Sequence, residues 1–160
     1  AFYAASNGSV ACLQYLHEQG CPWDYRALRE AAREGHVAAL LYLHEQGCVW
    51  DKRVGIAAAC VGQLESLEFL QEHDYPWHRD FLEAAVSHPA CFEYLHAHGC
   101  PWDARVLLAA VQHGELATVQ YACKHGCPWD RHVLKAALKN QKPVYLESLS
   151  ELGCIWPEDL

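Results

Sequence analysis

The chain has no methionine, fewer basic than acidic residues, and no long apolar run. Twelve Lys and Arg against 20 Asp and Glu give a formal net charge of -8, which argues against a protein whose whole surface grips nucleic acid or an anionic membrane. The longest apolar run on a predicted helix face, Val37 to Leu43, is far shorter than the roughly 20 residues of a membrane span. The charge balance and the short apolar run lead us to expect no membrane partner, and the missing methionine leads us to expect a piece of a longer chain.

The sequence motifs of several common enzyme classes are also missing. There is no GxxxxGK[ST] loop, no GxGxxG after a strand, no GxSxG elbow and no HExxH. The nine cysteines are odd in number, and their spacing follows a repeat rather than a disulfide framework, which favours a reducing compartment. We therefore expect a protein of the cytoplasm or nucleus that is not an enzyme and needs no cofactor.

All six tryptophans recur at a nearly constant spacing of 27, 27, 25, 27 and 27 residues. The ten-residue segment that contains each Trp also recurs. It reads YLHEQGCPWD at 15–24, YLHEQGCVWD at 42–51 and YLHAHGCPWD at 94–103. A fixed period of this size is the signature of a solenoid, in which each unit packs mainly on its neighbours. We predict one array over residues 1–160, with units of about 1–23, 24–50, 51–77, 78–102, 103–129 and 130–160.

Each unit reads as helix A, a turn, helix B and a connection. In helix A, apolar residues stand four, five, eight and nine places after the Trp, as in Val106, Leu107, Ala110 and Val111, which is the pattern of one helix face. Both helices would have about 8 to 11 residues, too few to be stable alone in water, so stacking between units must stabilise them. The predicted fold class is all-α, an α-solenoid of stacked helix-turn-helix repeats.

The GCPWD phrase predicts how the helices end and begin. Its Gly would take the left-handed conformation that ends helix B, and its Asp would cap the next helix A. Its Trp would pack under the connection, the alternative being a ladder of rings that stacks on a ligand. The residues in question are Gly20, Gly47, Gly99, Gly126 and Gly153, and the capping Asp24, Asp51, Asp103 and Asp130.

The segment AAREGHVAALLYLHEQGCVWD, Ala31 to Asp51, resembles the ankyrin-repeat pattern AAxxGHxxxVxxLLxxGAxxN. The YLHExGCPWD phrase resembles more closely the short ankyrin-type repeats of giant viruses, amoebae and other protists. The resemblance covers nearly the whole chain, but the period is 27 instead of the usual 33 and the TPLH tetrapeptide is missing, which implies reduced or absent β-hairpins. It also implies a protein–protein interaction module, either a scaffold or adaptor or a host-directed effector that acts in the host cytoplasm with the same binding face.

A structural zinc-binding repeat protein is the alternative. Its best candidate site combines Cys123 and Cys127 with His125 and His132, although that spacing differs from the usual close CxxC pair. Histidines 17, 44 and 96 are expected instead to hydrogen-bond the neighbouring connection. Cys12 and Cys91 share one place in helix B, where we expect them to fill the core.

Places three, six and ten after each Trp lie opposite the apolar face of helix A, and their side chains are uneven. Ile56 and Leu108 would be exposed aliphatic residues flanked by arginine, a feature of binding sites, although ordinary variation of a solvated surface would also produce such a row. Helix A segments hold ten of the twelve cations, whereas helix B segments hold Lys124 and nine glutamates. We predict that a monomeric array binds a protein or peptide with acidic or phosphorylated segments, and not nucleic acid. The candidate partner-binding residues are Arg26, Arg29, Arg33, Arg53, Ile56, Asp80, Glu83, Arg105, Leu108, His132, Lys135 and Lys139.

Overall fold

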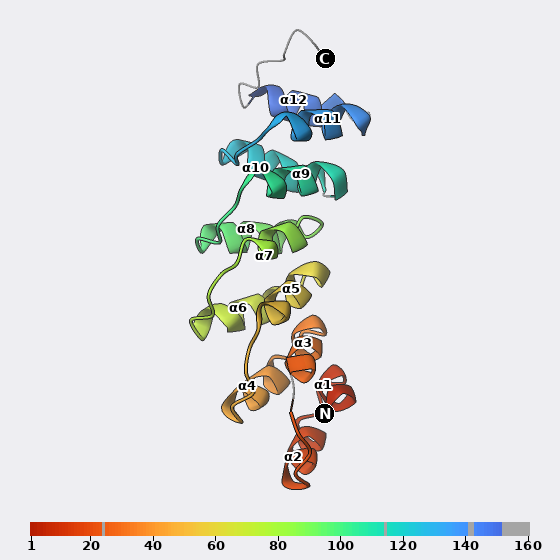
Figure 1. Cartoon of the computed structure of the whole chain (residues 1–160), viewed down its shortest axis with the longest axis vertical. Helices are drawn as coiled ribbons and strands as arrows, with labels where there is room; N and C mark the ends of the chain where they lie inside the picture. Colours follow the sequence, from red (N-terminus) through yellow and green to blue (C-terminus); the bar gives the residue numbers. More distant parts are fainter. Residues whose placement is uncertain (24, 114, 141–142, 152–160) are drawn as a thin grey trace.

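The computed structural model describes residues 1–23, 25–113, 115–140 and 143–151, and within these ranges the chain forms twelve α-helices and no strand (Figure 1). Ten of the helices have nine or ten residues, as the period predicts. The two exceptions, α1 and α7, have five. The bounds are α1 Phe2–Ser6, α2 Val10–Glu18, α3 Tyr25–Arg33, α4 Val37–Glu45, α5 Lys52–Val61, α6 Leu64–Glu72, α7 Asp80–Ala84, α8 Pro89–Ala97, α9 Ala104–His113, α10 Leu116–Lys124, α11 Arg131–Lys139 and α12 Pro143–Glu151.

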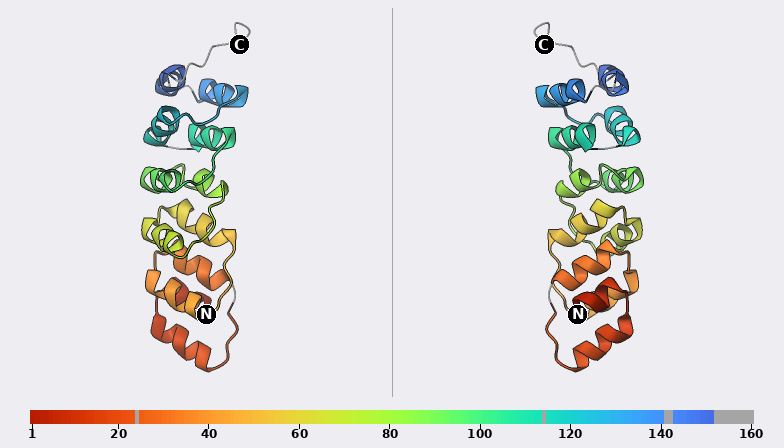
Figure 2. Two further views of the ribbon diagram at one scale, coloured as in Figure 1. Left: turned by 90° about the vertical axis from the view of Figure 1, so that its left-hand side faces the viewer. Right: turned by 90° about the vertical axis from the view of Figure 1, so that its right-hand side faces the viewer.

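The helices form two parallel rows that run along the long axis of the molecule (Figure 2). Odd-numbered helices, here called row A, contact one another in the order α1, α3, α5, α7, α9 and α11, and even-numbered helices, row B, do the same from α2 to α12. Each row A helix also packs on the row B helix that follows it in the chain. The predicted all-α solenoid is confirmed, and no β-hairpin connects the pairs within the described ranges.

The core runs without interruption through the stack, between the two rows. In α9 the predicted apolar face is confirmed, since Val106, Leu107, Ala110 and Val111 are all buried. The equivalent stripe of α3 consists of Ala27, Leu28, Ala31 and Ala32, and every one of these side chains is completely buried. Small residues at these places let neighbouring row A helices approach closely.

Cys12 departs from the prediction, since it is exposed, whereas Cys91 at the same place in α8 is buried. Ser66 is the equivalent residue of α6, and its hydroxyl donates a 2.9 Å hydrogen bond to the Ala32 carbonyl of the preceding helix pair. Side chains at this place of the row B helices therefore point toward the preceding pair. Among the described residues no helix pair precedes α1 and α2. Cys12 therefore faces outward.

The connections between pairs follow the predicted punctuation. Gly99, which follows α8, has a left-handed backbone conformation with φ +80°. Gly20, Gly47 and Gly126 adopt the same conformation after their row B helices. Asp74 takes the same place in the third unit with φ +54°, a conformation that Asn and Asp tolerate better than other residues with a Cβ. Gly153 and the cap Asp24 lie outside the described residues.

Three of the predicted caps are confirmed by hydrogen bonds to the first turn of a row A helix. The Asp51 carboxylate accepts from the backbone N–H of Arg53 at 2.8 Å, and that of Asp103 accepts from the N–H of Arg105 at 3.0 Å. Asp130 accepts from two N–H groups, those of His132 at 2.8 Å and Val133 at 3.2 Å. These bonds satisfy donors that have no partner inside the helix.

Histidine rings join neighbouring pairs at the turn between the two helices. The ring of His36 hydrogen-bonds the Ser6 carbonyl, and the ring of His88 hydrogen-bonds the Cys60 carbonyl, each through Nε2 at 3.0 Å. A carbonyl oxygen only accepts, so Nε2 carries the proton in both. The rings lie so close to the preceding turn that a Cβ on Gly62 would come within 2.6 Å of His88. These bonds set the register of successive pairs.

Candidate functional site

The structure places all twelve candidate residues on row A helices, which follow one another along the solenoid. The stack therefore brings residues from five helices into one series, as the repeat predicts. Arg26, Arg33, Arg53, Glu83, Arg105, His132, Lys135 and Lys139 are exposed, while Arg29, Ile56, Asp80 and Leu108 are partly buried.

Ile56 and Leu108 are not the exposed aliphatic residues that we expected. Both are partly buried and pack against the core. They stand three places before Ala59 and Val111, which belong to the buried stripe, and residues three apart are neighbours on a helix surface. The sixth place after the Trp thus lies at the margin of the buried face. A side chain at this place is partly covered by the core and does not project into solvent.

The arginines of α3 are engaged within the chain. Arg29 contacts Oε1 of Glu30 at 2.9 Å, and Arg33 approaches Oε2 of the same carboxylate at 3.6 Å. Glu30 is only 5% exposed, and a buried carboxylate is costly unless it is paired. The two arginines therefore have a structural task, which reduces what they can offer to an anionic partner.

A line of ion pairs connects the first turns of α5, α7 and α9. Lys52 contacts Asp80 at 3.0 Å, and Arg79 contacts Asp103 at 3.3 Å. Asp103 is also held by Arg105 at 3.0 Å. The hydrogen bond from Lys52 lowers the pKa of Asp80, and that from Arg105 lowers the pKa of Asp103. These half-exposed pairs are each worth at most about 1 kcal/mol, but they neutralise the cations that the sequence placed here.

Charges without such compensation remain at the middle and at the C-terminal end of row A. Glu83, Lys135 and Lys139 take part in no salt bridge between described residues. His132 and Arg53, by contrast, lie near the capping carboxylates Asp130, at 3.4 Å, and Asp51, at 3.7 Å. The charges without a salt bridge are therefore acidic at Glu83 of α7 and basic at Lys135 and Lys139 of α11.

Among the described residues, three of the hollows in the surface lie along the row A helices and their connections. They have volumes of about 560, 440 and 470 Å³ and are open to solvent. The candidate residues Arg26 and Arg29 line the first, and Ile56, Asp80 and Glu83 line the third. The first is lined by Ala1, Phe2, Tyr3, Pro22, Arg26 and Arg29, the second by Trp23, Tyr25, Gly47, Cys48, Val49 and Asp51, and the third by Ile56, Asp80, Glu83 and Ala84.

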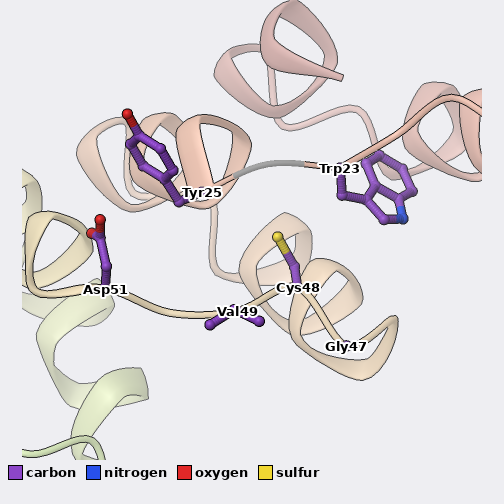
Figure 3. Close-up of a pocket in the computed structure, with 6 residues that line it drawn as sticks. All are labelled: Trp23, Tyr25, Gly47, Cys48, Val49 and Asp51. Atoms are coloured by element: carbon purple, nitrogen blue, oxygen red, sulfur yellow. The ribbon is translucent and has the colours of Figure 1, made fainter.

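The second hollow was missed at the level of sequence. Figure 3 shows Cys48 and Val49 on the connection that leads into α5, with Trp23 to one side and Asp51 to the other. Val49 is 79% exposed and stands where the first unit has Pro22. The change from GCPWD to GCVWD was the one feature of the sequence that could have pointed to this hollow. It puts an exposed aliphatic side chain in a connection, where packing does not require one.

Trp23, Trp50, Trp77 and Trp102 are partly buried and contact neighbouring rings, which favours the packing interpretation, whereas Trp129 is 36% exposed and Trp156 lies outside the described residues. The Trp23 ring lies 5.3 Å from that of His17 and 6.3 Å from that of Tyr42, and the Trp102 ring stacks on His96 at 3.8 Å. Trp23 and Trp102 are partly buried. Their contacts leave the ligand-ladder interpretation without support.

The histidine column bonds other groups than we expected. His17 and His96 hydrogen-bond the hydroxyl groups of Tyr42 and Tyr121, on the following row B helix, at 3.3 and 3.1 Å. Nδ1 of His44 instead accepts from the indole N–H of Trp50 in the same unit. The partners are thus aromatic side chains and not the backbone of the connection.

The zinc alternative finds no set of ligands in the described part of the chain. No group of three or more His, Cys, Asp or Glu side chains there could hold a metal ion. Burial raises the pKa of the Cys127 thiol to about 12, and its Sγ–H donates to the Asp103 carbonyl at 3.8 Å. The Cys127 thiol is thus directed at a backbone carbonyl of the preceding connection.

Comparison with known proteins is informative for the fold. No family model matches the chain, and no curated protein matches it. Within the described ranges, no helix is long and apolar enough to cross a membrane. Among solved structures, the human ASB11 ankyrin repeat domain is similar, with a TM-score of 0.81 and 22% identity over 96% of this chain and 83% of that chain. The chain therefore has the fold of an ankyrin repeat domain, an α-solenoid of stacked helix pairs.

Proposed function

We propose that residues 1–160 form one non-catalytic protein-binding array, an ankyrin-type scaffold or adaptor that holds a protein or peptide against the row A side. The observation that carries the proposal is the series of hollows along row A, lined by side chains that differ from pair to pair while the buried stripe stays apolar. In a solenoid, packing requires the buried columns, whereas the face columns are free to suit a partner.

The C-terminal end of this face suits an acidic or phosphorylated segment of the partner. Lys135 and Lys139 are exposed on α11 without a salt bridge to any described residue. Arg26 lines the first hollow beside Phe2 and Tyr3 at the opposite end, where an aromatic contact could accompany an anionic one. We propose monomeric binding, with the partner extended across several helix pairs.

A reducing compartment suits the cysteines. Cys12 and Cys60 are exposed free thiols, which oxidation would put at risk outside a reducing environment. We accordingly place the array inside a cell, in the cytoplasm or nucleus.

The test begins with panning of the chain against a phage-displayed library of random 12-residue peptides. Selected peptides are synthesised and their dissociation constants measured by fluorescence anisotropy. We expect Lys135→Glu with Lys139→Glu to weaken peptides that carry acidic residues by about tenfold or more, because two attractive contacts become repulsive. Circular dichroism checks that the variants remain folded.

The matched control reverses two exposed charges of row B, Glu18→Lys with Glu45→Lys. These substitutions should leave peptide affinity within about twofold, since both residues stand on row B helices and line none of the three hollows. The proposal is wrong if no peptide is enriched, or if the control weakens binding as much as the row A variant does.

A further inference from the structure

The third hollow combines an aliphatic wall with two carboxylates. It lies between α5 and α7, has a volume of about 470 Å³, and is lined by Ile56, Asp80, Glu83 and Ala84. Ile56 and Ala84 are partly buried and pack on the core, so this wall is held in place. Glu83 is exposed.

The cations near this hollow are engaged by Asp103 and by Asp80, and none of them forms a salt bridge with Glu83 among the described residues. Arg105 of α9 contacts the Asp103 carboxylate through Nη2 at 3.0 Å and through Nε at 3.3 Å. Lys52, His78 and Arg79 all contact Asp80, at 3.0, 3.2 and 4.0 Å, so this carboxylate of the hollow is already paired. Glu83 has no salt bridge to another described residue, so its charge is left for a group that comes from outside.

Glu83 is the carboxylate of the hollow that has no salt bridge to a described residue. The hydrogen bond to Asp103 is the main cause that raises the pKa of Arg105, and the charges of Glu83 and Asp80 raise it further. A cation that enters the hollow would meet the charge of Glu83, whereas the charge of Asp80 is already balanced by its cationic neighbours. Its stem would meet Ile56 and Ala84, which offer only apolar atoms beyond the backbone.

Lysine and arginine side chains match both the aliphatic wall and the carboxylate of this hollow, because each joins a long apolar stem to a cationic end. We propose that the third hollow receives a lysine or arginine side chain of the bound protein segment, with its stem against Ile56 and Ala84 and its charge at Glu83. This inference rests on the proposed function and refines it. The partner carries a basic residue at α7 and acidic residues toward α11.

The experiment uses the 12-residue peptides selected on the wild-type chain. We expect them to share a Lys or Arg, and replacement of that residue by norleucine, which keeps the stem and removes the charge, should weaken binding about fivefold, the upper value for a partly exposed ion pair. Glu83→Gln should weaken the parent peptide by the same factor and leave the norleucine peptide unchanged. Glu83→Arg combined with a peptide whose basic residue is replaced by Glu should restore binding. Glu93→Gln, an exposed glutamate on α8 of row B, is the matched control and should change neither peptide.

Three results overturn the inference. Peptides that bind through Lys135 and Lys139 but contain no shared basic residue contradict it and leave the proposed function standing. Equal losses for the parent and norleucine peptides in Glu83→Gln also contradict it, because the two groups would then act independently. If no peptide binds at all, both proposals are wrong.

Discussion

Replacement of Gly55 by alanine tests how closely α5 and α7 approach each other. Gly55 is a buried residue inside α5, and a Cβ built on it would lie 2.5 Å from Cζ and 2.6 Å from Cε2 of Phe81. Carbon atoms in good contact are about 3.5 to 4.0 Å apart. The added methyl group therefore requires the Phe81 ring to retreat by about 1 Å.

The ring has little space for such a movement. Phe81 is completely buried, and its centroid lies 6.1 Å from that of Tyr75 and 5.8 Å from that of Trp77. Overpacking of a core costs about 1 to 3 kcal/mol, whereas alanine gains about 1 kcal/mol over glycine in a helix interior. We expect Gly55→Ala to lower the free energy of unfolding by about 1 kcal/mol.

Urea unfolding followed by far-UV circular dichroism measures the effect, and Phe81→Leu supplies the matched background. With leucine at 81 the ring is gone, so Gly55→Ala should stabilise the chain by up to about 1 kcal/mol through helix propensity. The sign of the change should thus reverse between the two backgrounds. Stabilisation by Gly55→Ala in the wild-type chain, or an equal change in both backgrounds, would refute the close approach.

Three further predictions concern single groups. Asp130→Ala should lower the free energy of unfolding by about 1 kcal/mol because two helix N–H groups lose their acceptor, and a thermal melt with no shift would contradict this. Because the pKa of Asp103 is lowered in the folded state by its hydrogen bond with Arg105, this pair stabilises the chain above about pH 4 and ceases to do so as the pH falls through the folded pKa. Asp103→Asn should therefore flatten the fall of Tm between about pH 5 and pH 2.5. Burial raises the pKa of Cys100 to about 12, so iodoacetamide at pH 8 should alkylate the exposed Cys12 and spare Cys100, as mass spectrometry would show.

Features that depend on neighbours along the chain were predictable from sequence. Gly99 takes the left-handed conformation, and Asp130 caps α11. The period of the tryptophans predicted helix pairs of nearly constant length, and the apolar stripe of α9 predicted its buried face. Each of these features reflects a local preference for dihedral angles or hydrogen bonds, repeated in every unit.

Features that depend on the neighbouring pair escaped prediction. Cys12 and Cys91 share a place in the sequence pattern, yet only Cys91 is covered by a preceding helix pair. Ile56 lies at the margin of the buried face and is partly buried against the core, beside residues of α7 from the next pair. The hollow beside Val49 arises between two connections that the sequence pattern treats as separate.

The amino-acid sequence by itself determined the repeat, the two helices of each unit and the row of uneven side chains that they present. Only the tertiary structure decided which of those charges are available, because the ion pairs join groups that stand one repeat apart. Lys52 meets Asp80 across 28 residues, and Arg79 meets Asp103 across 24. Whether two such side chains touch depends on how far one helix pair is displaced from the next, and that displacement follows from the packing of the core rather than from any local pattern.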